Sequence, residues 1–230
     1  MLTVVKVGGG LGRAAGDAAL RALCSTLGRL GERHPLLVVP GGAGFADAVR
    51  DADRRFELSA AASHRMAILG MEQFGWLLGE LIPDAVRCDD LARAHTLAGE
   101  RTVVLLPAGL PLDALPASWR VTADSIAAWV ADQLGAGRLV LVKEAGGLYA
   151  DWPARGEPIG RLSVAELAAL RAAGRAGGVD EYLPAVLDGA HFETWVVGGR
   201  DPARVAELLE RGTTAGTRIA AGRLLRCGHG

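Results

Sequence analysis

The sequence predicts an α/β protein in which helices cover both faces of a mainly parallel β-sheet. Two short runs rich in β-branched residues, 2–7 and 35–40, flank a stretch whose apolar residues recur at helical spacing. This strand, helix and strand order favours parallel pairing, because the helix returns the chain to the starting edge of the sheet. With 230 residues, 50% of them hydrophobic, the chain can bury a large core, and we expect one domain with two lobes.

The first half of the chain alternates strands and helices. Four leucines from Leu20 to Leu30 lie along one face of the helix expected between the first two strands. Ser59 is a suitable N-cap for the second of two consecutive helices, because its hydroxyl can accept a backbone N–H of the first turn. The elements expected here are strands at 2–7, 35–40 and 101–107, helices at 13–32, 45–56 and 59–82, and a proline-punctuated loop at 107–119.

The second half continues this alternation. Thr122 can cap the helix that opens it, and the strand after that helix ends on Lys143. A loop rich in glycine and proline then extends to residue 160. The elements expected here are helices at 122–136, 163–174, 180–190 and 201–211, strands at 138–143 and 193–198, and a terminal hairpin at 216–225.

Charge and composition favour a small-molecule partner. The net charge is -1 and the arginines are scattered, so no basic face for nucleic acid or an anionic membrane is expected. No signal peptide or membrane-helix pattern is present, which predicts a cytosolic protein. Cys24, Cys88 and Cys227 lack the spacing of a zinc site or a disulfide framework, and we expect them to be reduced and to pack in the interior.

Lysine is rare in this chain, which has Lys6 and Lys143 against 23 arginines. A chain of this size ordinarily carries on the order of a dozen lysines. A bias toward arginine on the surface would leave two by chance. Alternatively, both positions need a compact, strongly hydrated ammonium group that a planar guanidinium cannot imitate. Both lysines stand at the ends of predicted strands, and this placement can distinguish chance from a need for two ammonium groups.

Glycines gather at the carboxyl ends of four predicted strands, within 6–10, 40–44, 143–147 and 198–200. Ligands of open parallel sheets bind beyond these ends. Glycine lets backbone N–H groups approach an anion, and a following helix adds its positive dipole end. One such turn often serves conformation alone, but four turns together with two lysines predict a phosphate-rich ligand.

The common signatures of nucleotide and hydrolase sites are absent. No glycine is followed by lysine, which excludes a Walker A loop, and no G-x-G-x-x-G motif follows the first strand. The sequence also lacks the G-x-S-x-G, H-E-x-x-H and paired-cysteine motifs. Any phosphate chemistry must therefore use another arrangement.

Asp124 is expected in the first turn of its helix and has two interpretations. Its carboxylate can simply favour the helix dipole. Alternatively, it stands between the two ammonium groups and holds both in place. Phosphoryl transfer depends mostly on positioning and on charge stabilisation, which Lys6, Lys143 and backbone N–H groups could supply.

These motifs resemble the amino acid kinase family. The resemblance spans nearly the whole chain and rests on VVKVGGGL (4–11), VVPGGAGF (38–45), VTADSIAAWVA (121–131), VLVKEAGGLY (140–149) and GTRI (216–219). It implies a three-layer αβα sandwich as a single domain over 1–230. It also implies a phosphoryl-acceptor lobe at about 1–120, a lobe for MgATP at about 121–230, and a homodimer or higher homo-oligomer.

The resemblance assigns roles to individual residues. Lys6 would stabilise the transferring phosphoryl group, Lys143 would hold ATP phosphate, and Asp124 would organise both. Magnesium in this family is held largely by ATP oxygens, so no residue is assigned to a metal. The remaining assignments are Gly8, Gly9, Gly10, Gly147, Tyr149, Gly216 and Thr217 for ATP, and Gly41, Gly42 and Gly44 for the acceptor. His64 and Arg65 begin a helix expected to border the acceptor site and are candidates for acceptor binding, while a lone histidine is also commonly a structural residue.

Within the family, residues 40–51, 62–75 and 179–184 resemble the archaeal-type kinases of methanofuran biosynthesis, which convert aminomethylfuran phosphate into a diphosphate, and their relatives in methylotrophic bacteria. Pro40 stands where isopentenyl phosphate kinases carry histidine, and this difference argues against that subgroup. KEAGG at 143–147 departs from the lysine and aspartate pattern of many members. If the acceptor is a phosphate ester, an arginine is expected to bind it, and the sequence does not separate Arg50, Arg54 and Arg65.

Other readings stay open at this level. The acceptor could be UMP, isopentenyl phosphate or a carboxylate. A binding protein similar to the molybdate storage proteins would keep ATP without a metabolic acceptor. Three of the five tryptophans, Trp76, Trp119 and Trp129, are expected in the core.

Overall fold

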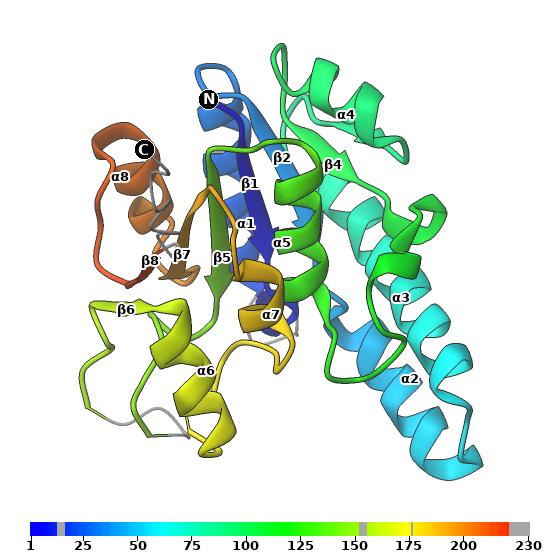
Figure 1. Ribbon diagram of the computed structural model, residues 1–230. Helices are drawn as coiled ribbons and strands as arrows, with labels where there is room; N and C mark the ends of the chain where they lie inside the picture. Colours follow the sequence, from blue (N-terminus) through cyan, green and yellow to red (C-terminus); the bar gives the residue numbers. More distant parts are fainter. Residues whose placement is uncertain (13–16, 152–155, 176, 221–230) are drawn as a thin grey trace, which may run out of the picture.

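The computed structural model describes residues 1–12, 17–151, 156–175 and 177–220. These residues form an eight-stranded sheet between two layers of helices, which confirms the predicted three-layer α/β sandwich (Figure 1). The strands are β1 (Thr3–Val7), β2 (Leu36–Pro40), β3 (Val86–Cys88), β4 (Val103–Leu105), β5 (Arg138–Lys143), β6 (Arg161–Ser163), β7 (Glu193–Gly198) and β8 (Thr217–Ala220). The α-helices are α1 (Asp17–Gly31), α2 (Ala43–Phe56), α3 (Ala60–Leu81), α4 (Leu91–Leu97), α5 (Ala123–Gln133), α6 (Val164–Ala172), α7 (Leu183–Leu187) and α8 (Ala203–Arg211).

The strand order is β3-β4-β2-β1-β5-β7-β8-β6. The six strands from β3 to β7 in this order are parallel, whereas β8 pairs antiparallel with β7 and β6 runs parallel to β8. The central position of β1, between β2 and β5, follows from its fully buried run TVVKV. The carboxyl ends of β1, β2, β5 and β7 therefore meet at one edge of the sheet.

A separate hydrophobic core fills each side of the sheet. On one side α1 and α8 pack, together with Phe74 and Leu78 of α3, and the four leucines of α1 are all buried there. On the other side α5, α6 and α7 cover the sheet, with α5 in front of it in Figure 1. Helices α2 and α3 lie side by side at the margin of the sheet.

Three short elements were not predicted from the sequence. They are β3, α4 and β6, which have three, seven and three residues. Such short elements show no measurable periodicity, and their strands form the two edges of the sheet. The predicted hairpin at 216–225 is corrected in part: β8 pairs with β7 and β6 of the earlier chain, and residues 221–230 lie outside the described residues.

The tryptophan prediction is right for one residue of three. Trp129 is buried, Trp119 is partly exposed, and Trp76 is 50% exposed. Trp76 lies on the outer side of α3, with the Arg87 guanidinium 4.6 Å from its ring centroid. The prediction failed there because a helix that continues past the sheet buries only part of its circumference.

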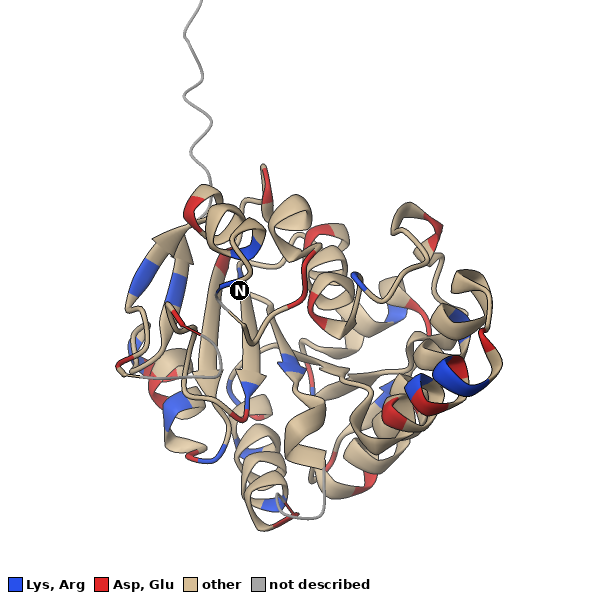
Figure 2. Ribbon diagram, turned by 90° about the horizontal axis from the view of Figure 1, so that it is seen from below, with Lys and Arg blue, Asp and Glu red and all other residues tan. Residues whose placement is uncertain are grey.

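Cys24 and Cys88 are buried free thiols, and Cys227 lies outside the described residues. Burial raises the pKa of Cys24 to about 12, so this thiol stays protonated. Basic and acidic positions are interspersed around the outside of the fold (Figure 2). None of the described helices combines the length and apolar character needed to cross a bilayer.

Candidate active site

The two lysines of the chain meet at the carboxyl edge of the sheet. Lys6 is the fourth residue of β1 and Lys143 is the last residue of the neighbouring strand β5. Lys6 is 5% exposed, and the side chain of Lys143 is 14% exposed. One buried and one largely buried ammonium group need nearby negative charge, because burial without compensation is costly.

Asp124 supplies that charge from the first turn of α5. Its Oδ1 lies 3.0 Å from Lys6 Nζ, and its Oδ2 accepts a 2.5 Å hydrogen bond from Lys143 Nζ. Thr122, the predicted N-cap, accepts the Asp124 N–H and so shapes this turn. We call Lys6, Asp124 and Lys143 the charged centre. Of the two interpretations open for Asp124, the geometry is that of a bridge between ammonium groups.

Burial and charge act in opposite directions on the carboxylate. Burial raises the pKa of Asp124, but attraction to Lys143 and Lys6 outweighs it and lowers this pKa to about 2. For Lys143, burial dominates and lowers the pKa to about 8, although Asp124 partly opposes the shift. Asp124 is therefore ionised at neutral pH, and the charge of Lys143 becomes sensitive to pH just above neutrality.

Asp180 braces the charged centre and was missed from the sequence. Its carboxylate accepts five hydrogen bonds, and its own N–H donates to Asp124 Oδ2 at 3.2 Å. The donors are Thr122 N (2.8 Å), Thr122 Oγ1 (2.9 Å), Ser125 N (3.0 Å), Ser125 Oγ (2.6 Å) and Leu183 N (2.8 Å). Asp180 thereby joins the start of α7 to the start of α5. In the sequence it resembles any acid near the start of a helix, and nothing there links it to residues 122–125.

Burial, together with repulsion from Asp124, raises the pKa of Asp180. The hydrogen bonds from Ser125 and Thr122 oppose that shift. The carboxylate is thus balanced between a buried, negative neighbourhood and a ring of donors. Asp180 contacts the charged centre through its own N–H, which donates to Asp124, and through its hydrogen bonds to the start of α5. We therefore regard Asp180 as a positioning residue.

The first two glycine turns pack backbone against backbone. The Gly8 N–H donates to the Val142 carbonyl at 2.8 Å, and the Gly41 N–H donates to the Val7 carbonyl at 2.9 Å. A Cβ on Gly9 would lie 2.6 Å from the Ala43 nitrogen. Gly9 and Gly42 therefore offer only backbone atoms to the space beside Lys6, as a phosphate cradle requires.

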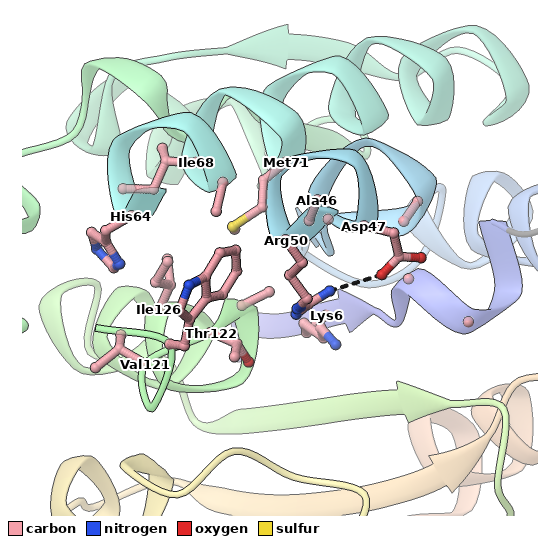
Figure 3. A pocket seen from close by; sticks show the side chains of 17 residues that line it. Lys6, Ala46, Asp47, Arg50, His64, Ile68, Met71, Val121, Thr122 and Ile126 are labelled. Carbon is pink, nitrogen blue, oxygen red and sulfur yellow. Dashed lines mark hydrogen bonds and ion pairs between the residues drawn. The ribbon is translucent and has the colours of Figure 1, made fainter. Parts of the chain in front are cut away.

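A cavity of about 200 Å³ opens beside Lys6, between α2, α3 and the start of α5. Figure 3 shows Lys6 and His64 on opposite sides of it. Its lining is apolar in the middle and polar at both ends. The wall consists of Lys6, Gly9, Gly10, Gly42, Ala43, Ala46, Asp47, Arg50, His64, Ala67, Ile68, Met71, Trp119, Val121, Thr122, Ala123 and Ile126.

The cavity distinguishes the three arginines that the sequence left open. Arg50 lines it, pairs with Asp47 at 2.8 Å, and lies 4.9 Å from the Trp119 ring centroid. Arg54 instead forms an exposed ion pair with Asp51. Arg65 was assigned to the acceptor, but its guanidinium donates to the Ala108 carbonyl and is not part of the cavity wall.

Two other acceptor assignments have different surroundings. His64, a candidate for acceptor binding, is one of the residues of the wall. Gly44 is exposed, is not part of the wall, and has open space where a Cβ would lie. Gly41 is buried below the cavity, so its part is to hold the turn.

The residues assigned to ATP by resemblance fall into two groups. Gly8, Gly9 and Gly10 lie in the first turn, and Gly10 would bring a Cβ to 3.0 Å from Glu144 Oε2. The second group surrounds the ends of β5 and β8. There a Cβ on Gly147 would lie 2.8 Å from Thr217 Oγ1. Gly216 has a φ of 157°, and a Cβ on this residue would lie close to the Val196 carbonyl oxygen.

Thr217 has a structural task in this second group. Its side chain is fully buried, and its Oγ1 accepts the Leu148 N–H at 2.8 Å. The Thr217 side chain thus holds the 144–149 loop in place, and the assignment of this residue to ATP stays a prediction. Tyr149 is partly exposed, and an ion pair between Glu144 and Arg200 joins the ends of β5 and β7.

The fold brings two ammonium groups and one carboxylate together at the carboxyl edge of the sheet, where open parallel sheets bind their ligands. Residues 1–191 match the family model described as the amino acid kinase family. The chain belongs to this family and is a phosphotransferase.

Individual relatives agree with this assignment. The chain is 28% identical over 211 residues to (5-(aminomethyl)furan-3-yl)methyl phosphate kinase of Methanocaldococcus jannaschii, covering 90% of this chain and 92% of that protein. It is 33% identical over 138 residues to acetylglutamate kinase of Bifidobacterium animalis, covering 59% of this chain and 45% of that protein. The structure resembles that of uridylate kinase from Archaeoglobus fulgidus, with a TM-score of 0.76, 22% identity, and coverage of 96% and 100%.

Proposed function

We propose that the protein transfers the γ-phosphoryl group of MgATP to a small phosphate monoester, such as aminomethylfuran phosphate, and forms a diphosphate. The observation that carries this proposal is the position of Lys6. Its ammonium group belongs both to the buried charged centre and to the wall of the cavity. A phosphoryl group in transit between ATP and a cavity-bound acceptor would pass this ammonium group.

The acceptor is proposed to occupy the cavity, within the lobe formed mainly by residues 1–120. Lys6 and Arg50 supply positive charge for an ester phosphate. Ile68, Met71 and Ile126 give an apolar middle that suits a small ring. The relative from Methanocaldococcus jannaschii, which matches over most of both chains, is named for an acceptor of this type.

ATP is proposed to bind in the lobe formed mainly by residues 121–230, with its phosphates toward Lys143. Gly9, Gly10 and Gly42 bring backbone to the wall and suit phosphate oxygens, whereas the N–H groups of Gly8 and Gly41 already donate to backbone carbonyls. Among the described residues, no three His, Cys, Asp or Glu side chains cluster as a metal site. Mg²⁺, which would neutralise phosphate charge, is therefore proposed to be held mainly by the oxygens of ATP.

Phosphoryl transfer requires little covalent participation by the protein. An oxygen of the acceptor phosphate forms a bond to the γ-phosphorus as the bond between that phosphorus and the bridging oxygen of ADP breaks. The acceptor phosphate is already ionised, so no general base is needed. Lys6 stabilises the transferring group, Lys143 the leaving side, and Asp124 fixes both ammonium groups.

The protein is also proposed to form a homo-oligomer through α3. Met66, Leu69, Trp76 and Leu77 on this helix are between 38% and 50% exposed. Such a run of large apolar side chains is typical of a surface that another subunit covers.

Formation of ADP with a set of acceptors tests the function. We expect turnover with aminomethylfuran phosphate to exceed that with UMP, isopentenyl phosphate and acetylglutamate. The Lys6→Ala variant should be slower by about a hundredfold or more, since it removes an electrostatic catalyst. Arg54→Ala, a change of an exposed cation outside the cavity, is the matched control and should leave the rate unchanged.

Three outcomes would contradict the proposal. Undiminished turnover of Lys6→Ala would remove its assigned role. Faster turnover of acetylglutamate than of the phosphate esters would mean that the acceptor group is a carboxylate. ATP binding without turnover of any acceptor would favour a storage protein.

A further inference from the structure

An indole ring from a loop lies against helix α2 at the acceptor cavity. Trp119, in the loop that leads into α5, lines the cavity, and so does Arg50 of α2. The Trp119 Nε1–H donates to Asp53 Oδ2 at 2.6 Å, and the guanidinium carbon of Arg50 lies 4.9 Å from the centroid of the ring. One side chain of the loop therefore contacts two side chains of the helix.

The side of α2 that meets this ring carries an acid, a base and a second acid. Asp47, Arg50 and Asp53 are three residues apart, which places them on one side of a helix. Asp47 accepts a hydrogen bond from Arg50 Nη1 at 2.8 Å, whereas Asp53 accepts from the indole. The two carboxylates therefore hold the arginine and the ring, one each.

A comparison with Arg54 shows what the ring adds. Arg54 pairs with Asp51 at the same spacing, and its side chain is 75% exposed, against 44% for Arg50. Fixing a long side chain in one orientation costs conformational entropy, so an exposed ion pair alone holds an arginine weakly. A guanidinium within about 6 Å of an indole centroid is also attracted by the ring. Trp119 therefore gives Arg50 a support that Asp51 alone does not give Arg54.

A supported guanidinium suits an anion at this end of the cavity. Arg50 and Lys6 lie at the same end (Figure 3). Arginine carries several N–H donors, and the pair with Asp47 uses Nη1, which leaves donors for the oxygens of a phosphate. Binding costs less entropy when the donor is already oriented.

We propose that Trp119 is a positioning residue for the phosphate of the acceptor. Its indole ring, anchored by Asp53, holds the Arg50 guanidinium where it binds the ester phosphate beside Lys6. This inference rests on the proposed function and adds to it a residue that acts on the acceptor through Arg50. The charged centre is braced separately by Asp180, so the effect is expected on acceptor binding and not on the transfer step.

Acceptor kinetics with aminomethylfuran phosphate test this role. Trp119→Leu should raise KM for the ester about two- to fivefold, as for loss of one cation–π contact, and leave kcat and the KM for ATP unchanged. Trp119→Phe keeps a ring beside Arg50 and should lie nearer to the wild type. Asp53→Ala removes the anchor from outside the cavity wall and should also raise KM for the ester. Phe56→Leu, which removes a ring 5.0 Å from Arg55 on the same helix and outside the wall, is the matched control and should leave KM unchanged.

A double-mutant cycle separates positioning from direct contact with the substrate. Trp119→Leu should raise KM for the ester in the wild-type background and add nothing in the Arg50→Ala background. A similar rise in both backgrounds would mean that Trp119 meets the acceptor directly, and the proposal would be overturned. It would also be overturned if neither Trp119→Leu nor Asp53→Ala raises KM.

The proposed function and this inference can fail separately. If the wild type turns over no phosphate ester, the proposed function fails, and calorimetric binding of aminomethylfuran phosphate then decides the role of Trp119. Weaker binding by Trp119→Leu that disappears in the Arg50→Ala background supports the inference. Equal binding by the wild type and Trp119→Leu, or no binding by the wild type, refutes it.

Discussion

The charged centre and the Arg50–Asp47 pair of the cavity wall are both polar, but different structures hold them. The Lys6–Asp124 pair is buried, with side-chain exposures of 6% and 3%, and its residues belong to β1 and the start of α5. The Arg50–Asp47 pair on α2 has exposures of 44% and 37%. Removing one partner of a buried pair typically costs about 3–5 kcal/mol, whereas an exposed pair contributes about 0–1 kcal/mol.

This difference separates chemistry from selectivity. The charged centre depends on the register of β1 against β5 and on the brace by Asp180, so a change there disturbs several elements. The cavity wall away from the sheet depends on side chains of α2 and α3 and on Trp119, which can change without disturbing the sheet. Relatives that share phosphoryl transfer and differ in acceptor are expected to differ mainly at this part of the wall.

The largest effect is expected when Asp180, which braces the charged centre, becomes Asn. Its amide group would face backbone and hydroxyl donors, and unmet donors cost about 1–3 kcal/mol of unfolding free energy. A displacement of Asp124 by about 1 Å would lower kcat by about a hundredfold. Chemical denaturation and steady-state rates measure both effects, and Asp132→Asn, at the exposed end of the same helix, is the control.

A pH profile separates positioning from a loss of folding in Asp180→Asn. The negative charge of Asp180 raises the pKa of Lys143, so its removal should move the alkaline fall in rate toward lower pH. An unchanged profile with reduced stability would reduce Asp180 to a structural role.

An intermediate effect is expected from pH itself. Lys143 loses its charge as the pH rises through about 8, so kcat/KM for ATP should fall about tenfold per pH unit above that value. Lys143→Arg stays protonated and should show no such fall, although its rate is lower. If kcat/KM of Lys143→Arg falls at the same pH as in the wild type, the titrating group is not Lys143.

Folding should not cause this alkaline loss. Because the pKa of Lys143 is lower in the folded chain than its ordinary 10.5, the unfolded chain binds more protons between about 8 and 10.5. This group therefore adds stability as the pH rises through that range. Circular dichroism at pH values above 8 should show a folded protein with reduced activity.

The smallest effect is expected at the exposed pair. Arg50→Ala should raise KM for aminomethylfuran phosphate several-fold, leave kcat within about twofold, and change unfolding free energy by less than about 1 kcal/mol. Arg54→Ala is again the control. A large loss of kcat in Arg50→Ala would move this residue from binding to the transfer step and weaken the comparison drawn above.

The sequence predicted the main architecture because each signal was local. Apolar runs indicated β1, β2, β4, β5 and β7, and the predicted bounds of β5 and β7 agree with the structure. The caps Ser59 and Thr122 lie where they were expected. Parallel strands place their carboxyl ends together, so the approach of Lys6 to Lys143 follows from the strand pattern as well.

Long-range contacts could not be predicted in this way. Asp180 is 56 residues from Asp124, and Trp119 is 66 residues from its partner Asp53. No local pattern shows which of Arg50, Arg54 and Arg65 faces a cavity, because a helix surface offers all of them to solvent. Thr217 looked like a ligand residue in the sequence and is fully buried in the fold.

For this protein, the sequence by itself determined the sandwich and the presence of two lysines and an aspartate at one edge of its sheet. Hydrophobic periodicity and the geometry of parallel strands are sufficient for that. Only the tertiary structure decided that Asp180 braces Asp124 and that Arg50 and His64 line the same cavity. The physical reason is that burial and hydrogen bonding depend on segments far apart in the chain, which come together only when the helices pack on the two faces of the sheet.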